Sequence, residues 1–228
     1  MKRIKILKII FEQEIKPYQV SKLRGAIANL IGNDGVLFHN HLSDNKLRYS
    51  YPLIQYKIAN KKATLICIDK GTNEVNMLFN KDNLDIDLEG TRLNLTINSL
   101  NANYHIMQVW DKFFNYSIVN WLGLNSKNYE IYNKMDSEVE RIQFLEKILV
   151  GNILSMAKGL GINVDKKIEL KIQKIESSRV IKYKDADLTV FNMKFKANFF
   201  IPNNLGLGKG VSHGYGNVRE IKKYKRDE

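Results

Sequence analysis

The sequence has few of the residues that stabilise extracellular proteins covalently. It contains one cysteine, Cys67, among 228 residues, so an internal disulfide is excluded. Cys67 stands in the apolar run Leu65-Ile66-Cys67-Ile68, which predicts a buried, small hydrophobic side chain.

Long apolar segments are also missing. No stretch reaches the roughly 20 apolar residues that a transmembrane helix needs. The start of the chain, Met1-Lys2-Arg3-Ile4-Lys5-Ile6-Leu7-Lys8, is too densely charged for the apolar part of a signal peptide. We therefore expect a soluble, cytoplasmic protein without a membrane partner.

Acidic residues are outnumbered by basic ones. The 36 Lys and Arg residues exceed the 24 Asp and Glu residues, which gives a formal net charge of +12. Such a surplus attracts polyanions and releases their counterions on contact, so nucleic acid is the expected partner. The plentiful Lys, Asn and Ile are also typical of an AT-rich genome, so composition alone leaves this open.

The first half of the chain predicts the order β-α-β-β-α-β. Apolar and polar residues alternate at the start, and a helix beginning at Pro17 carries its apolar residues on one face and ends at Gly32. The expected elements are a strand at 3–11, this helix, a hairpin of 51–58 and 63–68, a short helix at 72–80 and a strand at 91–97. This order is the split βαβ, or ferredoxin-like, pattern.

The second half repeats the pattern. Its clearest element is a helix over 138–160, with a capping box formed by Ser137 and Glu140. The expected strands are 104–110, 167–175, 179–184 and 187–200, with a turn at Ser177-Ser178, whereas 113–135 is ambiguous. The prediction is an α+β fold of tandem ferredoxin-like domains, residues 1–108 and 109–228.

A glycine-rich loop follows the last long strand. Five of the chain's 14 glycines lie within residues 206–216. Exposed amides in such a loop can cradle phosphate, and an aromatic side chain can stack on a base. The candidate RNA-binding residues here are Gly206, Gly208, Lys209, Ser212, His213 and Tyr215. A purely structural turn stays open, but nucleotide-binding fingerprints fit poorly, because a strand rather than a helix should follow and Lys209 precedes Gly210.

The motif Gly206-Leu207-Gly208, a polar spacer and Ser212-His213-Gly214-Tyr215-Gly216 resembles the C-terminal motif of the repeat-associated RNA-binding proteins. Within them, the chain resembles the CRISPR repeat-processing endoribonucleases (Cas family six) of the b subfamily. The tandem pattern extends this resemblance over nearly the whole chain. It implies that the glycine loop organises the RNA-binding face and is not the catalytic element.

The resemblance also implies a catalytic site in the loop after the first helix. In this loop the chain resembles the b subfamily, whose members have two histidines separated by one residue and a tyrosine shortly after. These positions correspond to His39, His41 and Tyr49, with Tyr51 as the reserve because it would point the same way in an extended segment.

Histidine suits metal-independent RNA cleavage because its pKa lies near neutrality. One group takes the proton of the 2′-hydroxyl and another gives a proton to the leaving 5′-oxygen, which yields a 2′,3′-cyclic phosphate and a 5′-hydroxyl. Lys46 and Arg48 would stabilise the phosphorane. Which histidine is the base stays open, as does a role for His41 in phosphate binding only. Lys22 and Arg24, on the polar side of the first helix, could reach the RNA backbone.

Other interpretations compete with this one. The histidine pair could bind zinc or iron, but metal sites usually need further ligands, so we expect no metal and no cofactor. The letters His-Asn-His match the HNH nucleases only by accident, and two solvated loop histidines are the simplest reading. A non-catalytic RNA-binding subunit of a CRISPR effector complex and a small-molecule regulator of the same fold also stay open. Dimers are common among similar proteins, so a homodimer is another open prospect.

Overall fold

The computed structural model describes residues 2–39, 51–183 and 186–222. The chain divides into two compact units, which we call unit 1 and unit 2. Unit 1 comprises Met1–Ile106 and Gly210–Gly214, and unit 2 comprises Met107–Lys209 and Tyr215–Glu228. Within the described residues, no helix has the length and apolar character needed to cross a membrane.

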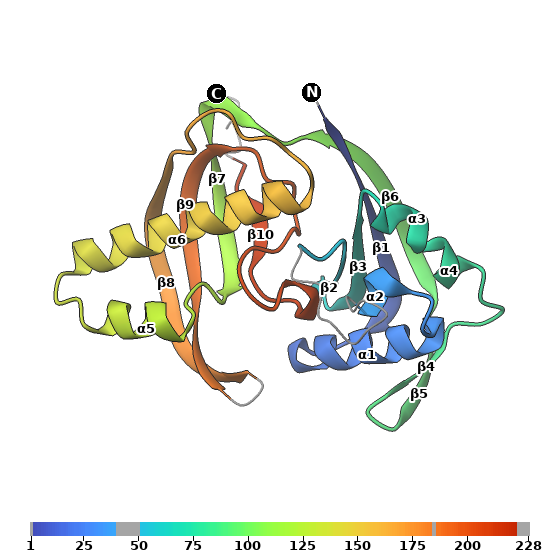
Figure 1. The fold of residues 1–228 in the computed structure, drawn as a ribbon. Coiled ribbons are helices and arrows are strands. Elements are labelled where there is room, and N and C mark those ends of the chain that lie inside the picture. The colour runs from blue at the N-terminus through green and yellow to red at the C-terminus, as the bar shows by residue number, and fades with distance from the viewer. Residues whose placement is uncertain (1, 40–50, 184–185, 223–228) are drawn as a thin grey trace, which may run out of the picture. The chain divides into compact units, whose positions relative to one another are not determined.

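Unit 1 is built on a four-stranded antiparallel sheet with the order β2-β3-β1-β6 (Figure 1). This is the strand order of a ferredoxin-like domain, so the predicted fold class is confirmed for this half. The elements are β1 (Arg3–Glu14), η1 (Pro17–Gln19), α1 (Val20–Ile31), α2 (Val36–His39), β2 (Ile54–Ala59), β3 (Lys62–Ile68), α3 (Gly71–Glu74), α4 (Asn76–Phe79), β4 (Asp85–Leu88), β5 (Thr91–Asn94) and β6 (Ile97–Ile106).

The first helix forms as its apolar spacing predicts. Val20, Leu23 and Ile27 of α1 are buried in one cluster with residues of β1, β2 and β3. Pro17 begins the preceding turn, where its missing N–H does no harm, and Gly32 ends α1 with a φ of 85°. The predicted hairpin is also confirmed, because β2 pairs with β3.

The prediction of one strand at 91–97 was wrong. The structure places β5 in a separate two-stranded hairpin with β4, and the fourth strand of the main sheet is β6, which pairs with β1 from Phe11↔Ile97 to Arg3↔Ile106. Residues 104–106, expected in the second half, therefore belong to β6. The asparagine-rich sequence of β6 hid the strand, because an edge strand with a mostly exposed surface shows little apolar alternation.

Unit 2 has a second four-stranded antiparallel sheet with the order β10-β7-β9-β8, again the ferredoxin-like order. Its long helix, α6, lies across one face of this sheet (Figure 1). The elements are β7 (Val109–Trp121), α5 (Ser126–Asn133), α6 (Glu138–Gly159), β8 (Leu170–Tyr183), β9 (Ala186–Phe199) and β10 (Asn217–Glu220). The short 3-10 helix η2 (Val211–His213) lies between β9 and β10 in the chain and belongs to unit 1.

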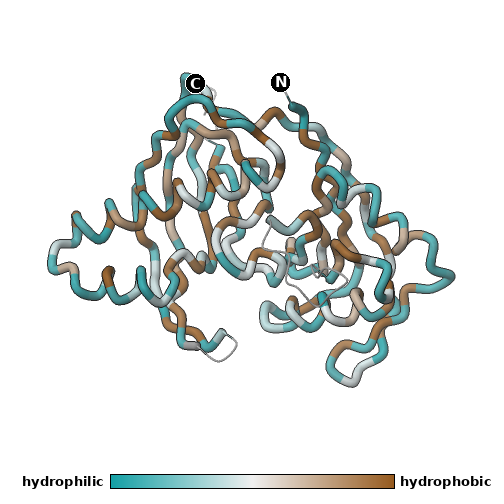
Figure 2. The backbone as a smooth tube through the Cα atoms, viewed as in Figure 1, coloured by the Kyte–Doolittle hydropathy of each residue, from teal (hydrophilic) through white to brown (hydrophobic). Residues whose placement is uncertain are grey.

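The capping box predicted for the long helix is only half formed by the contacts seen. The Ser137 Oγ accepts a hydrogen bond from the Glu140 N–H at 3.4 Å, and Gly161 follows the helix with a φ of 64°. Leu145, Leu149 and Ile153 point into the core. Hydrophobic and hydrophilic residues alternate along α6 and the strands in both units, as the tube in Figure 2 shows.

Two details of unit 2 differ from the prediction. No turn interrupts the chain at Ser177-Ser178, since β8 runs through both residues. Register shifts occur there instead, and the Asn192 Nδ2 donates to the Ser177 Oγ at 2.9 Å, which gives the polar serine a partner within the sheet. In residues 200–216, where a second helix would complete the β-α-β-β-α-β pattern, the chain instead forms a glycine-rich segment of turns, in which η2 is the only helical element.

Candidate functional site

His39 is the last residue of α2, a single helical turn that is tied to the core of unit 1. Phe38 is fully buried and Leu37 nearly so. Gly35 lets the turn approach α1 closely, because a Cβ there would lie 2.4 Å from the Ile31 Cγ2 atom. The residue before the histidine is therefore anchored in the core, while the His39 side chain itself is half-buried.

Charged side chains hold both ends of this short helix. The Glu74 carboxylate accepts a hydrogen bond from the Leu37 N–H at the beginning of α2. The Arg24 Nη2 donates to the His39 carbonyl oxygen at its end. A carboxylate at the start and a cation at the end satisfy backbone groups that a helix leaves unpaired. The backbone of His39 is thus fixed by a side chain from α1.

The His39 ring has a defined hydrogen bond. Its Nε2 lies 2.9 Å from the Gly32 carbonyl oxygen. A carbonyl oxygen only accepts, so Nε2 carries the proton and donates it to Gly32. The lone pair of the neutral ring is therefore on Nδ1, and Nδ1 is the nitrogen that can exchange a proton with a substrate.

Arg24 also reaches the glycine-rich segment. Its Nη1 lies 3.5 Å from the His213 Nε2, and the His213 Nδ1 lies 2.9 Å from the Ser21 Oγ. One guanidinium therefore brings together His39 and His213, two predicted site residues that are far apart in sequence. The sequence interpretation assigned Arg24 only to the RNA backbone and missed this bridge. The available signal was the spacing of Ser21 and Arg24, which places them on one face of α1.

A buried lysine holds the same segment. Lys57 of β2 is 1% exposed, and its Nζ donates to the Val211 carbonyl oxygen at 3.2 Å. Burial penalises the charged form and lowers the pKa of Lys57 to about 7. Sequence reasoning missed Lys57 because a lysine in an alternating strand normally indicates a solvated position.

Gly214 completes this part of the site in unit 1. It has a φ of +91°, and a Cβ would lie 3.0 Å from the Val20 Cγ1 atom. The backbone at this position can therefore approach α1 only without a side chain. Ser212, a predicted RNA-binding residue, is half-buried in the preceding turn.

The flanks of the loop belong to unit 2 and pack tightly there. A Cβ on Gly208 would lie 2.7 Å from the Leu122 carbonyl oxygen, and Gly206 forms an isolated bridge with Asn217. The Lys209 N–H donates to the Leu122 carbonyl oxygen, whereas the side chain of Lys209 is exposed. The close approach to Leu122 explains why residue 208 has no side chain, and the Lys209 cation is exposed to solvent.

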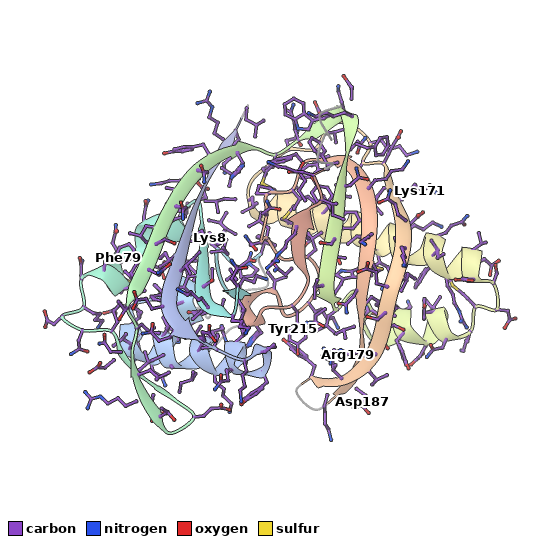
Figure 3. All side chains as sticks on the ribbon, turned by 180° about the vertical axis from the view of Figure 1, so that it is seen from behind. Lys8, Phe79, Lys171, Arg179, Asp187 and Tyr215 are labelled. Atoms are coloured by element: carbon purple, nitrogen blue, oxygen red, sulfur yellow. The ribbon has the colours of Figure 1, made fainter. Side chains whose placement is uncertain are left out.

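Tyr215 forms an aromatic pair with Tyr183. The ring centroids are 5.3 Å apart at an interplanar angle of 88°, an edge-to-face contact. Partial burial raises the pKa of the Tyr215 hydroxyl, against a smaller lowering by the charge of Arg179. Arg179 and Tyr215 are labelled near the same end of the unit 2 sheet in Figure 3. Two rings and a guanidinium therefore lie together in unit 2.

Some predicted residues lie outside the described residues, and the structure does not test them. They are His41, Lys46, Arg48 and Tyr49. The reserve tyrosine, Tyr51, is described and half-buried. In the part of the chain that is described, no group of three or more His, Cys, Asp or Glu side chains could hold a metal ion.

Two sheets of ferredoxin-like order and a glycine-rich segment before the last strand place the protein in the class of tandem ferredoxin-like proteins. Comparison with protein families identifies the particular branch. Residues 2–106 match the Cas6b N-terminal domain, and residues 108–221 match the Cas6b C-terminal domain. The chain therefore belongs to the Cas6b family, which confirms the resemblance inferred from the two motifs.

Solved structures agree with this assignment. A crystal structure of Cas6b is 31% identical, with a TM-score of 0.88, over 96% of this chain and 100% of that one. A crystal structure described as the CRISPR RNA processing endoribonuclease Cas6b is 29% identical, with a TM-score of 0.74 and the same coverage. An uncharacterized protein of Methanocaldococcus jannaschii is 44% identical over 101 residues, which are 44% of this chain and 67% of that protein.

Proposed function

We propose that this protein is an endoribonuclease that cleaves CRISPR repeat transcripts into guide RNAs without a metal ion. Membership of the Cas6b family supports the proposal, as does the similarity to a solved Cas6b described as a CRISPR RNA processing endoribonuclease. The net charge of +12 suits a polyanionic substrate.

The geometry of His39 is the observation that carries the proposal. Arg24 fixes its backbone through a hydrogen bond to the carbonyl oxygen, and its Nε2 donates a hydrogen bond to the Gly32 carbonyl oxygen. A catalytic acid or base needs a fixed ring and one nitrogen available for the proton. Nδ1 meets this need in either role, since the imidazolium would donate from the atom on which the neutral ring accepts.

The reaction needs a second titrating group. We assign it to His41, with Tyr49, or Tyr51 as the reserve, orienting the 2′-hydroxyl or donating to the phosphate. One group removes the 2′-hydroxyl proton, the 2′-oxygen attacks phosphorus, and the other group protonates the departing 5′-oxygen. The products are a 2′,3′-cyclic phosphate and a 5′-hydroxyl, and Lys46 and Arg48 balance the charge of the phosphorane.

RNA binding is assigned to the glycine-rich loop and the residues beside it. The exposed cation of Lys209 and the half-buried Ser212 offer donors to phosphate, and Tyr215 offers a ring to a base. Gly206 and Gly208 act by shaping the backbone that presents these side chains.

The test is cleavage of a labelled repeat RNA in EDTA, beside an RNA with a 2′-deoxy substitution at the cut site. We expect the first RNA to be cut to a 2′,3′-cyclic phosphate and the second to survive, because the 2′-oxygen is the nucleophile. The double variant His39→Ala, His41→Ala should bind the RNA but lose at least roughly 10³-fold in rate, since each general acid or base contributes about 10²–10⁴-fold.

Three outcomes would contradict the proposal. Cleavage of the 2′-deoxy RNA would exclude the internal nucleophile. Activity that disappears in EDTA and returns with a divalent cation would exclude the metal-independent mechanism. A wild-type protein that shifts repeat RNA in a gel but yields no product at any pH would instead identify a non-catalytic RNA-binding subunit.

A further inference from the structure

We infer that Arg24 and His213 are positioning residues for His39, and that they act through hydrogen bonds rather than by contact with RNA. The inference rests on the proposed function of His39. It assigns a new role to His213, which the sequence placed among RNA-binding residues, and to Arg24, which the sequence placed near the RNA backbone.

Arg24 donates hydrogen bonds to two different residues. A guanidinium only donates, so its Nη2 donates to the His39 carbonyl oxygen and its Nη1 donates to the His213 Nε2. The planar fork of arginine makes both contacts with its two terminal nitrogens, which the single ammonium of a lysine cannot do in the same geometry.

The two hydrogen bonds of the His213 ring define its tautomer. Since Nε2 accepts from Arg24, the proton of the neutral ring is on Nδ1, where it donates to the Ser21 Oγ at 2.9 Å. Both ring nitrogens are thus engaged within unit 1. A histidine held in this way suits the support of a neighbouring group better than proton exchange with a substrate.

The Arg24 side chain is half-buried, with its Nε on the inner side. The Arg24 Nε is buried and has no hydrogen-bond partner among the described residues. The two terminal nitrogens face the protein contacts already named. A cation used to bind phosphate would instead present its fork to solvent.

The two contacts of Arg24 couple the 210–214 segment to His39. Residues Gly210–Gly214 belong to unit 1, where Lys57 holds Val211 and the Arg24–Ser21 pair holds His213. The same arginine fixes the carbonyl end of α2. Movement of the 210–214 segment would therefore displace Arg24 and, through it, the backbone of His39.

The first experiment measures single-turnover cleavage and RNA affinity for Arg24→Gln, Arg24→Lys and His213→Ala. We expect Arg24→Gln to lower the cleavage rate by roughly 10- to 100-fold, because small displacements of a catalytic group have effects of this size. The RNA Kd and the slope of log K against log salt should stay as in the wild type. Arg24→Lys should lose most of the rate too, although it keeps the charge.

The controls separate positioning from loss of a positive charge and from unfolding. Lys81 is exposed in unit 1 outside the proposed site, so Lys81→Gln removes one charge and should leave rate, affinity and salt slope unchanged. Ser21→Ala removes only the second partner of His213 and should have a smaller effect in the same direction as Arg24→Gln. Thermal unfolding of each variant shows whether it is folded at the assay temperature.

A second measurement does not depend on cleavage. Two-dimensional ¹H–¹⁵N spectra of the imidazole rings should show His213 protonated on Nδ1 and His39 on Nε2 in the RNA-free protein. Arg24→Gln should change the ring signals of both histidines, whereas Lys81→Gln should change neither.

The possible results are distinct. A weaker Kd with a salt slope reduced by about one would make Arg24 a phosphate contact and overturn the inference. Cleavage rates that are unchanged in the Arg24 variants would overturn the inference as well, and so would His39 ring signals that do not change in Arg24→Gln. If the wild-type protein does not cleave repeat RNA, or if His39→Ala cleaves normally, the proposed function fails, while the ring spectra still decide whether Arg24 positions His39.

Discussion

Unit 1 and unit 2 share one strand order but connect the third and fourth strands differently. In unit 1 the connection contains α3, α4 and the β4–β5 hairpin, whereas in unit 2 it is the glycine-rich segment 200–216. The first connection buries side chains such as Val75 and Leu78. The second brings backbone against backbone, with Gly208 beside Leu122 and Gly216 beside Leu207.

This difference shows how a ferredoxin-like sheet can dispense with its second helix. Glycines allow the connection of unit 2 to pack closely, and its central part, Gly210–Gly214, belongs to unit 1. There it meets α1 through Ser21 and Arg24 and β2 through Lys57. The segment that replaces a helix in one half thus supplies side chains to the candidate site of the other.

Gly216→Ala tests the difference between the two connections and should have the largest effect on the free energy of unfolding. A Cβ at this position would lie 1.9 Å from the Leu207 carbonyl oxygen, and the φ of +63° disfavours any side chain. Left-handed strain and overpacking together should lower the free energy of unfolding by about 3 kcal/mol or more. Both tryptophans of the chain, Trp110 and Trp121, lie in unit 2, so chemical unfolding followed by their fluorescence reports on this unit.

Gly25→Ala is the matched control in unit 1. Gly25 lies within α1, and apart from its chain neighbours and the backbone of its own helix no described atom lies within 4 Å of the Cβ it would gain. Alanine should therefore stabilise the helix by about 0.5–1 kcal/mol. If Gly25→Ala and Gly216→Ala changed the free energy of unfolding equally, close backbone packing would not be particular to the glycine-rich segment.

Much of the fold could be predicted from local signals. The helices α1 and α6 were predictable because apolar residues recur at helical spacing and clear signals mark their ends, Gly32 for α1 and Ser137 for α6. The strand β6 was not, since Asn101, Asn103 and other exposed residues conceal the alternation of a strand that is paired on one side only. Local patterns thus predict elements whose burial is regular.

The candidate site could be predicted only in part. His39 and His213 could be predicted because each is a titratable residue close to glycines in the sequence. No local pattern shows that both contact Arg24. Arg24 and Lys57 take their roles from tertiary contacts, since each donates to a backbone or ring atom far along the chain. A cation whose partner is 154 positions away, as Val211 is from Lys57, gives no signal in a single sequence.

The next largest effect should come from Lys57→Met, which tests how unit 1 holds the segment. The pKa of Lys57 is about 7 in the folded protein and near 10.5 when exposed. Between pH 7 and pH 10.5, Lys57 is protonated in the unfolded state but not in the folded state. The free energy of unfolding therefore rises with pH in this range. Relative to Lys57→Met, the wild type should gain about 1 kcal/mol per pH unit between pH 7 and pH 9.

Urea unfolding at several pH values, followed by circular dichroism, measures this difference. Below pH 7 the lysine is protonated in both states and should contribute no pH dependence. Lys81→Met, at an exposed position, should give a curve parallel to that of the wild type. Parallel curves for the wild type and Lys57→Met would show that Lys57 does not lose its proton on folding.

The smallest effect concerns the aromatic pair of unit 2. If Tyr215 stacks on a base, Tyr215→Ala should weaken RNA binding by about 1–2 kcal/mol, roughly 10-fold in Kd, without a change in salt slope. Tyr215→Phe keeps the ring and its edge-to-face contact with Tyr183, so it should bind nearly as the wild type does. Tyr104, 66% exposed on β6 in unit 1, provides the control, and Tyr104→Ala should leave the Kd unchanged. Fluorescence anisotropy with a labelled repeat RNA measures the Kd of all three variants. An equal loss of affinity in Tyr104→Ala and Tyr215→Ala would mean that exposure alone, rather than the pairing with Tyr183, determines which rings bind RNA.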